Sequence, residues 1–119
     1  MYRAVKFRRT NKYKNKIIRY NGINFQSERE CNRYKELLLL KRAKLIKDLE
    51  LQKPFVLLEP YIKNGKKING IKYYADFYYT DIKTGLPVVE DAKGVKTQVY
   101  IIKKKLFEFK YKDLEIREV

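Results

Sequence analysis

The second half of the chain constrains the fold more than any other part of the sequence. It begins with a run from Ile71 to Thr80 that is rich in Tyr and Phe, as strands are. A short loop joins this run to a second strand, Val88 to Lys93, and a helix then leads to a last strand, Leu114 to Val119. Strands joined by a short loop pair antiparallel, whereas strand, helix, strand normally forms a right-handed crossover to a parallel neighbour. The order therefore predicts a mixed β-sheet.

Two helices are expected to pack on this sheet. The first runs from Ser27 to about Arg42, because Ser27 and Glu30 match the Ser-x-x-Glu capping box that begins many helices. The second runs from Thr97 to about Tyr111, where apolar residues recur at intervals of three and four. We therefore expect a mixed α/β fold with a central mixed sheet flanked by helices.

Turn signals define the shorter segments. Asn21-Gly22 lies between two apolar stretches and predicts a β-hairpin from Lys16 to Phe25. Two extended pieces, Ile46 to Gln52 and Phe55 to Glu59, are separated by Pro54, which indicates a bend or an edge position. Two Asn-Gly pairs at 64–65 and 69–70 predict turns in a basic loop. With no internal repeat, residues 1–119 are expected to form a single domain.

The chain is strongly basic, with 29 Lys and Arg, 14 Asp and Glu, and a net charge of +15. Residues 1–26 hold eight of the bases and no acid, which predicts a basic N-terminal arm over residues 1–16. A polyphosphate partner such as nucleic acid suits this charge, because each neutralised phosphate releases counterions. Two alternatives to nucleic-acid binding stay open. An AT-rich genome also favours Lys, and the N-terminal arm can be a solvated tail.

Several classes of function are excluded by what the chain lacks. It has no His and a single cysteine, Cys31, which excludes a zinc finger, a histidine general base, a Ser-His or Cys-His triad and a disulfide framework. No apolar run approaches the roughly 18 residues that a membrane span needs. We therefore expect a soluble, intracellular protein without membrane contact.

The acidic residues are the candidates for chemistry. Strand alternation places Asp91 and Lys93 on one side of their strand and Glu90 on the other. If this strand pairs with the preceding one, Asp76 converges with Asp91 and Lys93, and Glu30 in the first turn of its helix can supply a third carboxylate. The ordinary roles stay open too, with Asp76 as a polar residue on a solvated sheet face and Glu30 as a helix cap.

Clustered carboxylates would need a compensating cation. Two like charges about 4 Å apart cost on the order of 4 kcal/mol at an effective dielectric constant near 20. Oxygen ligands without His or Cys suit Mg²⁺ or Mn²⁺ better than Zn²⁺. Such an ion can activate water and neutralise a phosphoryl oxygen, which is the chemistry of phosphodiester hydrolysis.

The spacing of Asp91 and Lys93 carries little information by itself. The pattern acid-x-Lys occurs three times, at residues 81–83, 91–93 and 108–110, about as often as the composition predicts. Only Asp91-Ala-Lys93 ends an apolar strand and is followed by Gly94 and a helix. Context therefore selects this copy.

Three motifs in order resemble the PD-(D/E)XK nuclease superfamily. They are Ser27-x-x-Glu30 at a helix start, Tyr74-Ala75-Asp76-Phe77, and Val89-Glu90-Asp91-Ala92-Lys93-Gly94. More narrowly, the series is similar to that of an uncharacterised family of small phage-encoded members. It also resembles the endonuclease I type of phage Holliday-junction resolvase and the endonuclease subunit of some transposases. The resemblance covers roughly residues 22–119 and implies a restriction-endonuclease-like αβββαβ core, preceded here by the hairpin.

The resemblance also implies roles for individual residues. Asp76 and Asp91 would be metal ligands, with the Ala92 carbonyl as a further ligand, and Lys93 would be the catalytic lysine. Glu30 would be the helix-borne carboxylate that completes the catalytic and metal site, whereas Glu90, which lies on the opposite face, receives no role.

Two residues depart from the pattern of the superfamily. Ala75 replaces the Pro that gives the superfamily its name, a change that many members tolerate. Asp91 replaces the more frequent Glu, which shortens the reach of the carboxylate by one methylene. Neither change indicates an inactive enzyme.

The leading hypothesis is a Mg²⁺-dependent DNA endonuclease, acting on branched, recombining or replicating phage DNA in the cytoplasm of a bacterial host. The alternatives are a non-catalytic nucleic-acid-binding protein and a scaffold or regulatory factor that contacts an acidic protein. The resemblance also leaves a homodimer open, since several relatives are dimers. The expected DNA contacts are Arg8, Arg9, Lys12 and Lys14 in the arm, and Lys96, Lys103 and Lys104 beside the site.

Overall fold

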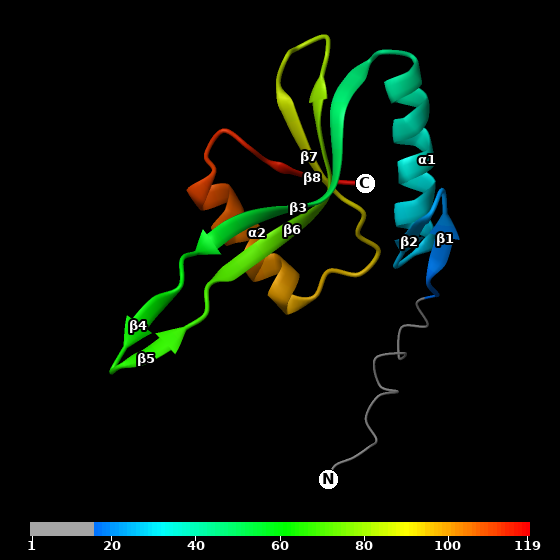
Figure 1. The fold of residues 1–119 in the computed structure, drawn as a ribbon. Helices are drawn as coiled ribbons and strands as arrows, with labels where there is room; N and C mark the ends of the chain where they lie inside the picture. Colours follow the sequence, from blue (N-terminus) through cyan, green and yellow to red (C-terminus); the bar gives the residue numbers. More distant parts are fainter. Residues whose placement is uncertain (1–15) are drawn as a thin grey trace.

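The structure is a computed structural model that describes residues 16–119. Its centre is a four-stranded mixed sheet that packs with two helices, as Figure 1 shows. Across the sheet the strands are, in order, β3 (Ile46–Leu58), β6 (Ile71–Asp81), β7 (Pro87–Asp91) and β8 (Ile116–Glu118). The mixed α/β architecture expected from the sequence is therefore confirmed. Four of the expected DNA contacts, Arg8, Arg9, Lys12 and Lys14, lie outside the described residues.

The predicted pairing of the strands is confirmed. β6 pairs antiparallel with β7, and β8 returns parallel to β7 after helix α2 (Gln98–Lys110). β7 therefore lies inside the sheet, hydrogen-bonded on both sides, and this fixes the positions of the residues at its carboxyl end.

Within residues 16–119, neither helix is long and apolar enough to cross a membrane.

The expectation of two separate extended pieces is wrong, because β3 is one strand, whereas the edge position that Pro54 indicated is confirmed. β3 runs unbroken through Pro54, which pairs with Tyr74 of β6. The strand tolerates proline because β3 is the edge of the sheet, where one row of backbone groups needs no partner. Its regularity instead fails at Asp48 and Gln52, whose φ angles of 55° and 53° lie in the left-handed region.

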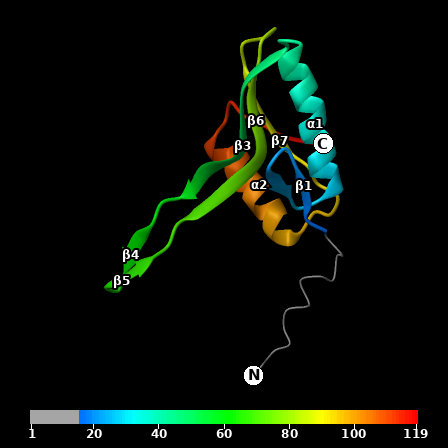
Figure 2. The same ribbon diagram turned by 45° about the vertical axis from the view of Figure 1, so that its right-hand side comes forward.

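Two small hairpins complete the fold. β1 (Ile18–Tyr20) and β2 (Ile23–Phe25) form the predicted one, with positive φ at both Asn21 and Gly22, as a type I′ turn requires. A second hairpin, β4 (Tyr61–Lys63) and β5 (Lys66–Ile68), occupies the stretch expected to be a basic loop. It projects away from the body of the molecule in both views (Figures 1 and 2).

The buried side chains form two clusters, one with helix α1 (Glu28–Arg42) and one with α2. Four alternating residues of β6 that are expected to share one face are all buried: Tyr73, Ala75, Phe77 and Tyr79. However, Phe77 and Tyr79 pack in the α1 cluster, whereas Tyr73 and Ala75 pack in the α2 cluster. The packing partner therefore changes at the residue between the two pairs, Asp76.

Candidate functional site

Glu30 reaches the site from the first turn of α1. The Ser27 hydroxyl accepts a hydrogen bond from the Glu30 backbone N–H at 3.1 Å, as the capping box predicts. The Glu30 side chain does not complete the box, because Oε1 accepts at 3.3 Å from the N–H of Gln26 rather than that of Ser27. Only 7% of Glu30 is exposed, so its carboxylate is held inward at the start of the helix.

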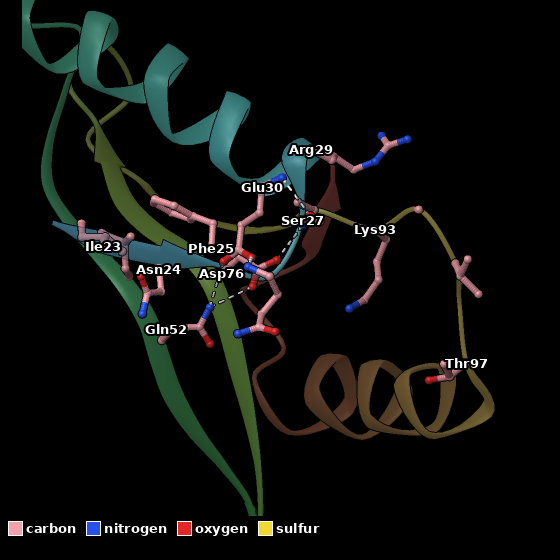
Figure 3. Close-up of a pocket in the computed structure, with 15 residues that line it drawn as sticks. Ile23, Asn24, Phe25, Ser27, Arg29, Glu30, Gln52, Asp76, Lys93 and Thr97 are labelled. Atoms are coloured by element: carbon pink, nitrogen blue, oxygen red, sulfur yellow. Dashed lines mark hydrogen bonds between the residues drawn. The ribbon is translucent and has the colours of Figure 1, made fainter. Parts of the chain in front are cut away.

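Asp76 faces Glu30 across the side chain of Gln52. The Gln52 amide nitrogen donates to Asp76 Oδ1 at 3.0 Å and to Glu30 Oε2 at 3.2 Å. The second Asp76 oxygen accepts from the Ala92 N–H at 2.8 Å. Figure 3 shows the three side chains pointing toward one another from α1, β3 and β6. Asp76 is therefore tied to both neighbouring strands of the sheet at the point where the packing changes.

Asp91, at the end of β7, is the most enclosed of the three acids. It is 2% exposed, and its Oδ2 accepts from the Tyr73 hydroxyl at 2.6 Å. Lys93 Nζ lies 2.9 Å from Oδ1 and 4.5 Å from the centre of the Tyr100 ring. This lysine is close enough for an ion pair but not aligned for a hydrogen bond, so Oδ1 is buried without a hydrogen-bond partner. Buried oxygens of this kind are unusual and suit a ligand.

The electrostatics of the three acids favour an added cation. Burial, followed by the nearby Asp76 carboxylate, raises the pKa of Glu30 from 4.5 to about 7. Burial, followed by repulsion from Asp91, also raises the pKa of Asp76. Burial and the Asp91 carboxylate keep the pKa of Tyr73 well above its ordinary value, so its hydroxyl remains a hydrogen-bond donor. Negative charge is therefore costly here unless a positive charge compensates it.

A hollow of about 720 Å³ opens onto Glu30 and Asp76. Its wall includes Glu30, Asp76 and Gln52, with Lys93 and Arg29 as its two basic side chains. In Figure 3, Lys93 lies on the segment between β7 and α2, across the opening from the two acids. The arrangement combines acids that could hold a cation with bases that could contact an anion.

The donor set matches a hard divalent cation, because carboxylate oxygens are the available ligands. Within the described part of the chain, however, no three His, Cys, Asp or Glu side chains lie close enough together to hold a metal ion. The amide of Gln52 lies between Glu30 and Asp76 and donates to both. The residues therefore have the chemistry of a metal site, and Gln52 occupies part of the space between two of its candidate ligands.

The structure brings four of the expected site residues into one region: Glu30, Asp76, Asp91 and Lys93. Ala92, expected as a ligand through its carbonyl, contributes its N–H to Asp76. The expected DNA-contacting lysines behave differently. Lys96 and Lys104 lie 3.0 and 3.8 Å from the carboxylate of Glu118, the β8 residue paired with Asp91. Lys103 lines a separate hollow near the β4–β5 hairpin.

Glu90 faces away from this site, as alternation predicts, and has its own partners. Arg33 of α1 donates to both of its oxygens at 2.8 and 2.7 Å, and the Tyr79 hydroxyl also donates to it. The hydrogen bonds to Glu90 raise the pKa of the Arg33 guanidinium above its ordinary value, although burial acts in the opposite direction. The group ties α1 to the sheet. The sequence carries no signal for it, because Arg33 and Glu90 are 57 residues apart.

The sequence alone did not identify two residues of the site, Gln52 and Tyr73. Gln52 reaches Asp76 only because β3 is continuous and its flanking residues, Leu51 and Lys53, pair with the residues on either side of Asp76. Tyr73 is expected on the face opposite Asp76, yet its hydroxyl contacts Asp91 and its ring packs in the α2 cluster. Neither residue belongs to a recognisable motif.

Comparison with known proteins identifies a family but no described relative. Residues 10–119 match the family described as "Protein of unknown function (DUF1064)", so the chain belongs to that family. No curated protein and no solved structure matches it.

Proposed function

We propose that this member of the DUF1064 family is a Mg²⁺- or Mn²⁺-dependent DNA endonuclease. Its substrate class would be branched, recombining or replicating phage DNA. One observation carries the proposal: Glu30 and Asp76, from two separate elements, line one hollow together with Lys93, and Lys93 forms an ion pair with buried Asp91. A protein that only binds phosphates gains nothing from acids facing its ligand, whereas metal-dependent hydrolysis requires them.

The metal would be held by Asp76, Asp91 and Glu30, with the Ala92 carbonyl as a further ligand. When bound, it would lower the pKa of a coordinated water and withdraw charge from a phosphoryl oxygen. The hydrogen-bond-free Oδ1 of buried Asp91 and the raised pKa of Glu30 and Asp76 support a cation at this place. The raised pKa values reflect burial and repulsion between neighbouring carboxylates, which a bound cation would relieve.

The other groups of the site would hold the reactants in position. Tyr73 donates to Asp91 and keeps one of its oxygens in a fixed direction. Lys93, between Asp91 and the Tyr100 ring, would stabilise negative charge on the attacked phosphate and orient the attacking water. Gln52 would release Glu30 or Asp76 when the ion binds.

The order of elements supports a restriction-endonuclease-like core. Without the two small hairpins, the chain runs α1, β3, β6, β7, α2, β8, which is the αβββαβ order that the sequence resemblance implies. The candidate acids lie at the start of α1, in the middle of β6 and at the end of β7. The likeness in order makes the nuclease hypothesis more specific than the basic charge alone.

A second candidate is a non-catalytic nucleic-acid-binding or regulatory protein on the same fold. It is favoured by Gln52, which satisfies two of the acids without any metal. In this alternative the acids would be structural, and the basic surface would carry the function.

A cleavage assay distinguishes the two candidates. Plasmid, linear and four-way-junction DNA are incubated with Mg²⁺ or Mn²⁺ and either the wild type or Asp91→Asn. We expect the wild type to cut and Asp91→Asn to lose at least about 100-fold in rate, since it loses a charged ligand and the partner of Lys93. Asp113→Asn is the matched control, because Asp113 is an exposed acid outside the site.

Two results would contradict this proposal in different ways. A wild type that binds DNA but never cuts with either ion would favour the non-catalytic alternative. Equal cutting by Asp91→Asn, with its fold verified by circular dichroism, would leave the enzyme hypothesis standing and overturn the site.

A further inference from the structure

The β4–β5 hairpin is the most exposed regular element of the described chain. Its strands pair as Tyr61 with Ile68, Ile62 with Lys67, and Lys63 with Lys66, closed by a turn at 64–65. Ile62 is 75% exposed, and β4 has no buried residue. Two strands of three residues form a hairpin that is at best marginally stable without a packing partner. An element of this kind, extended into solvent, favours a role in contacting another molecule.

The charge of the hairpin identifies what kind of molecule that is. Lys63 and Lys66 lie directly opposite each other, an arrangement of like charges that destabilises a hairpin. From residue 60 to residue 75 the chain has four lysines and no acid. Among residues 16–119, the salt bridges include none from Lys63, Lys66 or Lys67. A polyanion would remove this repulsion.

The root of the hairpin is tightly packed. A Cβ on Gly70 would overlap the carbonyl oxygen of Leu58 and crowd Pro60, so the two chains can approach this closely only because residue 70 is glycine. Beyond this point the hairpin continues the direction of β3 and β6 (Figures 1 and 2). The hairpin is therefore anchored at its root and extends the sheet.

A second hollow, of about 870 Å³, lies at this root and is separate from the candidate active site. Lys72, Tyr74 and Lys103 line it. Along β6, Lys72 and Tyr74 precede Asp76 at steps of two residues, so a basic and an aromatic side chain lie between the hairpin and the acids.

We propose that the β4–β5 hairpin binds duplex DNA by entering a groove about one helical turn from the bond to be cut. This inference rests on the proposed function, because it takes DNA as the substrate. From Lys67 to Asp76, nine residues in an extended chain span at most about 30 Å, close to the roughly 34 Å of one turn. A two-stranded ribbon is narrow enough for the major groove, which is about 12 Å wide.

The two faces of the hairpin favour a groove over a flat partner. Paired residues share a face, so Lys63 and Lys66 lie on one side and Lys67 lies on the other. A groove has a phosphate wall on each side of an inserted ribbon, and lysines on both faces can contact both walls. An acidic protein surface would use only one face of the hairpin.

Binding measured without metal tests this inference separately from cleavage. The variant Lys63→Gln/Lys66→Gln/Lys67→Gln is compared with Lys41→Gln/Lys47→Gln/Lys83→Gln, which removes the same charge from exposed residues at the far end of β3 and β6. Fluorescence anisotropy in EDTA gives the Kd for a duplex of about 30 base pairs and for one of about 10 base pairs, one helical turn.

We expect the hairpin variant to bind the longer duplex roughly 10- to 100-fold more weakly, with a salt slope smaller by about 2 to 3. The control variant should change the Kd less than threefold, and the preference for the longer duplex should persist only in the wild type and control. Circular dichroism should show all three proteins folded, since every substituted side chain is exposed.

Three results would overturn the inference. Equal weakening by both variants would mean that net charge alone acts. Unchanged DNA binding together with an altered mass in light scattering would assign the hairpin to a second copy of the chain. Unchanged DNA binding and unchanged mass would mean that the hairpin has no part in DNA contact. Because the binding assay contains no metal, each of these outcomes can be interpreted even if the protein does not cut DNA in the cleavage assay.

Discussion

Glu90 and Asp91 are neighbours on β7, and both are almost fully buried, yet their environments are opposite. Glu90 is 0% exposed and receives two hydrogen bonds from Arg33 and one from Tyr79. Asp91 is 2% exposed and faces Asp76, with one oxygen free of hydrogen bonds. Each carboxylate therefore has a basic partner, Arg33 for Glu90 and Lys93 for Asp91, but only Asp91 lies near a second acid.

This difference separates a structural charge from one available for chemistry. A buried carboxylate with a bidentate arginine is stable where it is and has little capacity for another ligand. A buried carboxylate next to a second one gains from any cation that enters. Three predictions test whether the contrast is real, from the largest expected effect to the smallest.

The first prediction concerns the paired charge. Arg33→Met should lower the free energy of unfolding by about 3 to 5 kcal/mol, because it leaves Glu90 charged, buried and without its cation. Urea denaturation measures the loss. Glu36→Gln is the control, since Glu36 is the exposed second partner of Arg33 and should cost under about 0.5 kcal/mol. A loss below about 1 kcal/mol in Arg33→Met would mean that Glu90 does not depend on this pair.

The second prediction uses the pKa of Glu30, which burial raises to about 7 from 4.5. Between these values the folded state keeps a proton that the unfolded state has lost, so this contribution to stability falls as the pH rises. In EDTA, wild-type stability should decline by on the order of 1 to 2 kcal/mol from about pH 5 to pH 7 relative to Glu30→Gln. Thermal melts across this range measure it, and parallel pH profiles for the two proteins would contradict it.

The third prediction reverses the sign seen for Glu90. In EDTA at neutral pH, Asp76→Asn should raise the free energy of unfolding slightly, by about 1 kcal/mol or less, because it removes a charge repelled by Asp91. The same variant should lose cleavage, as expected for a ligand. Urea denaturation measures the change beside Asp113→Asn. A marked destabilisation would show that Asp76, like Glu90, is held by structural partners.

Local signals predicted much of the fold and four members of the site. Asn21-Gly22 specified its turn, because both residues adopt positive φ readily. The Ser27 capping box marked the start of α1, and apolar residues at intervals of three and four marked α2. The opposite directions of Glu90 and Asp91 followed from strand alternation, which depends only on neighbouring residues.

Features that depend on distant strands were missed. The continuity of β3 through Pro54 was missed because proline fits both a bend and an edge strand, and only the sheet order decides between them. The β4–β5 hairpin resembled a loop because its exposed lysines hide the alternation of a strand. Gln52 and Tyr73 join the site only through strand register and the change of packing at Asp76.

The sequence by itself determined the kinds of groups that this protein can use: hard oxygen ligands, lysines, and no histidine or second thiol. It also determined the local elements that carry those groups, because caps, turns and alternation act over a few residues. Only the tertiary structure decided which acids are paired and which remain in need of charge. That outcome depends on side chains brought together from distant strands, and burial then makes each missing partner costly.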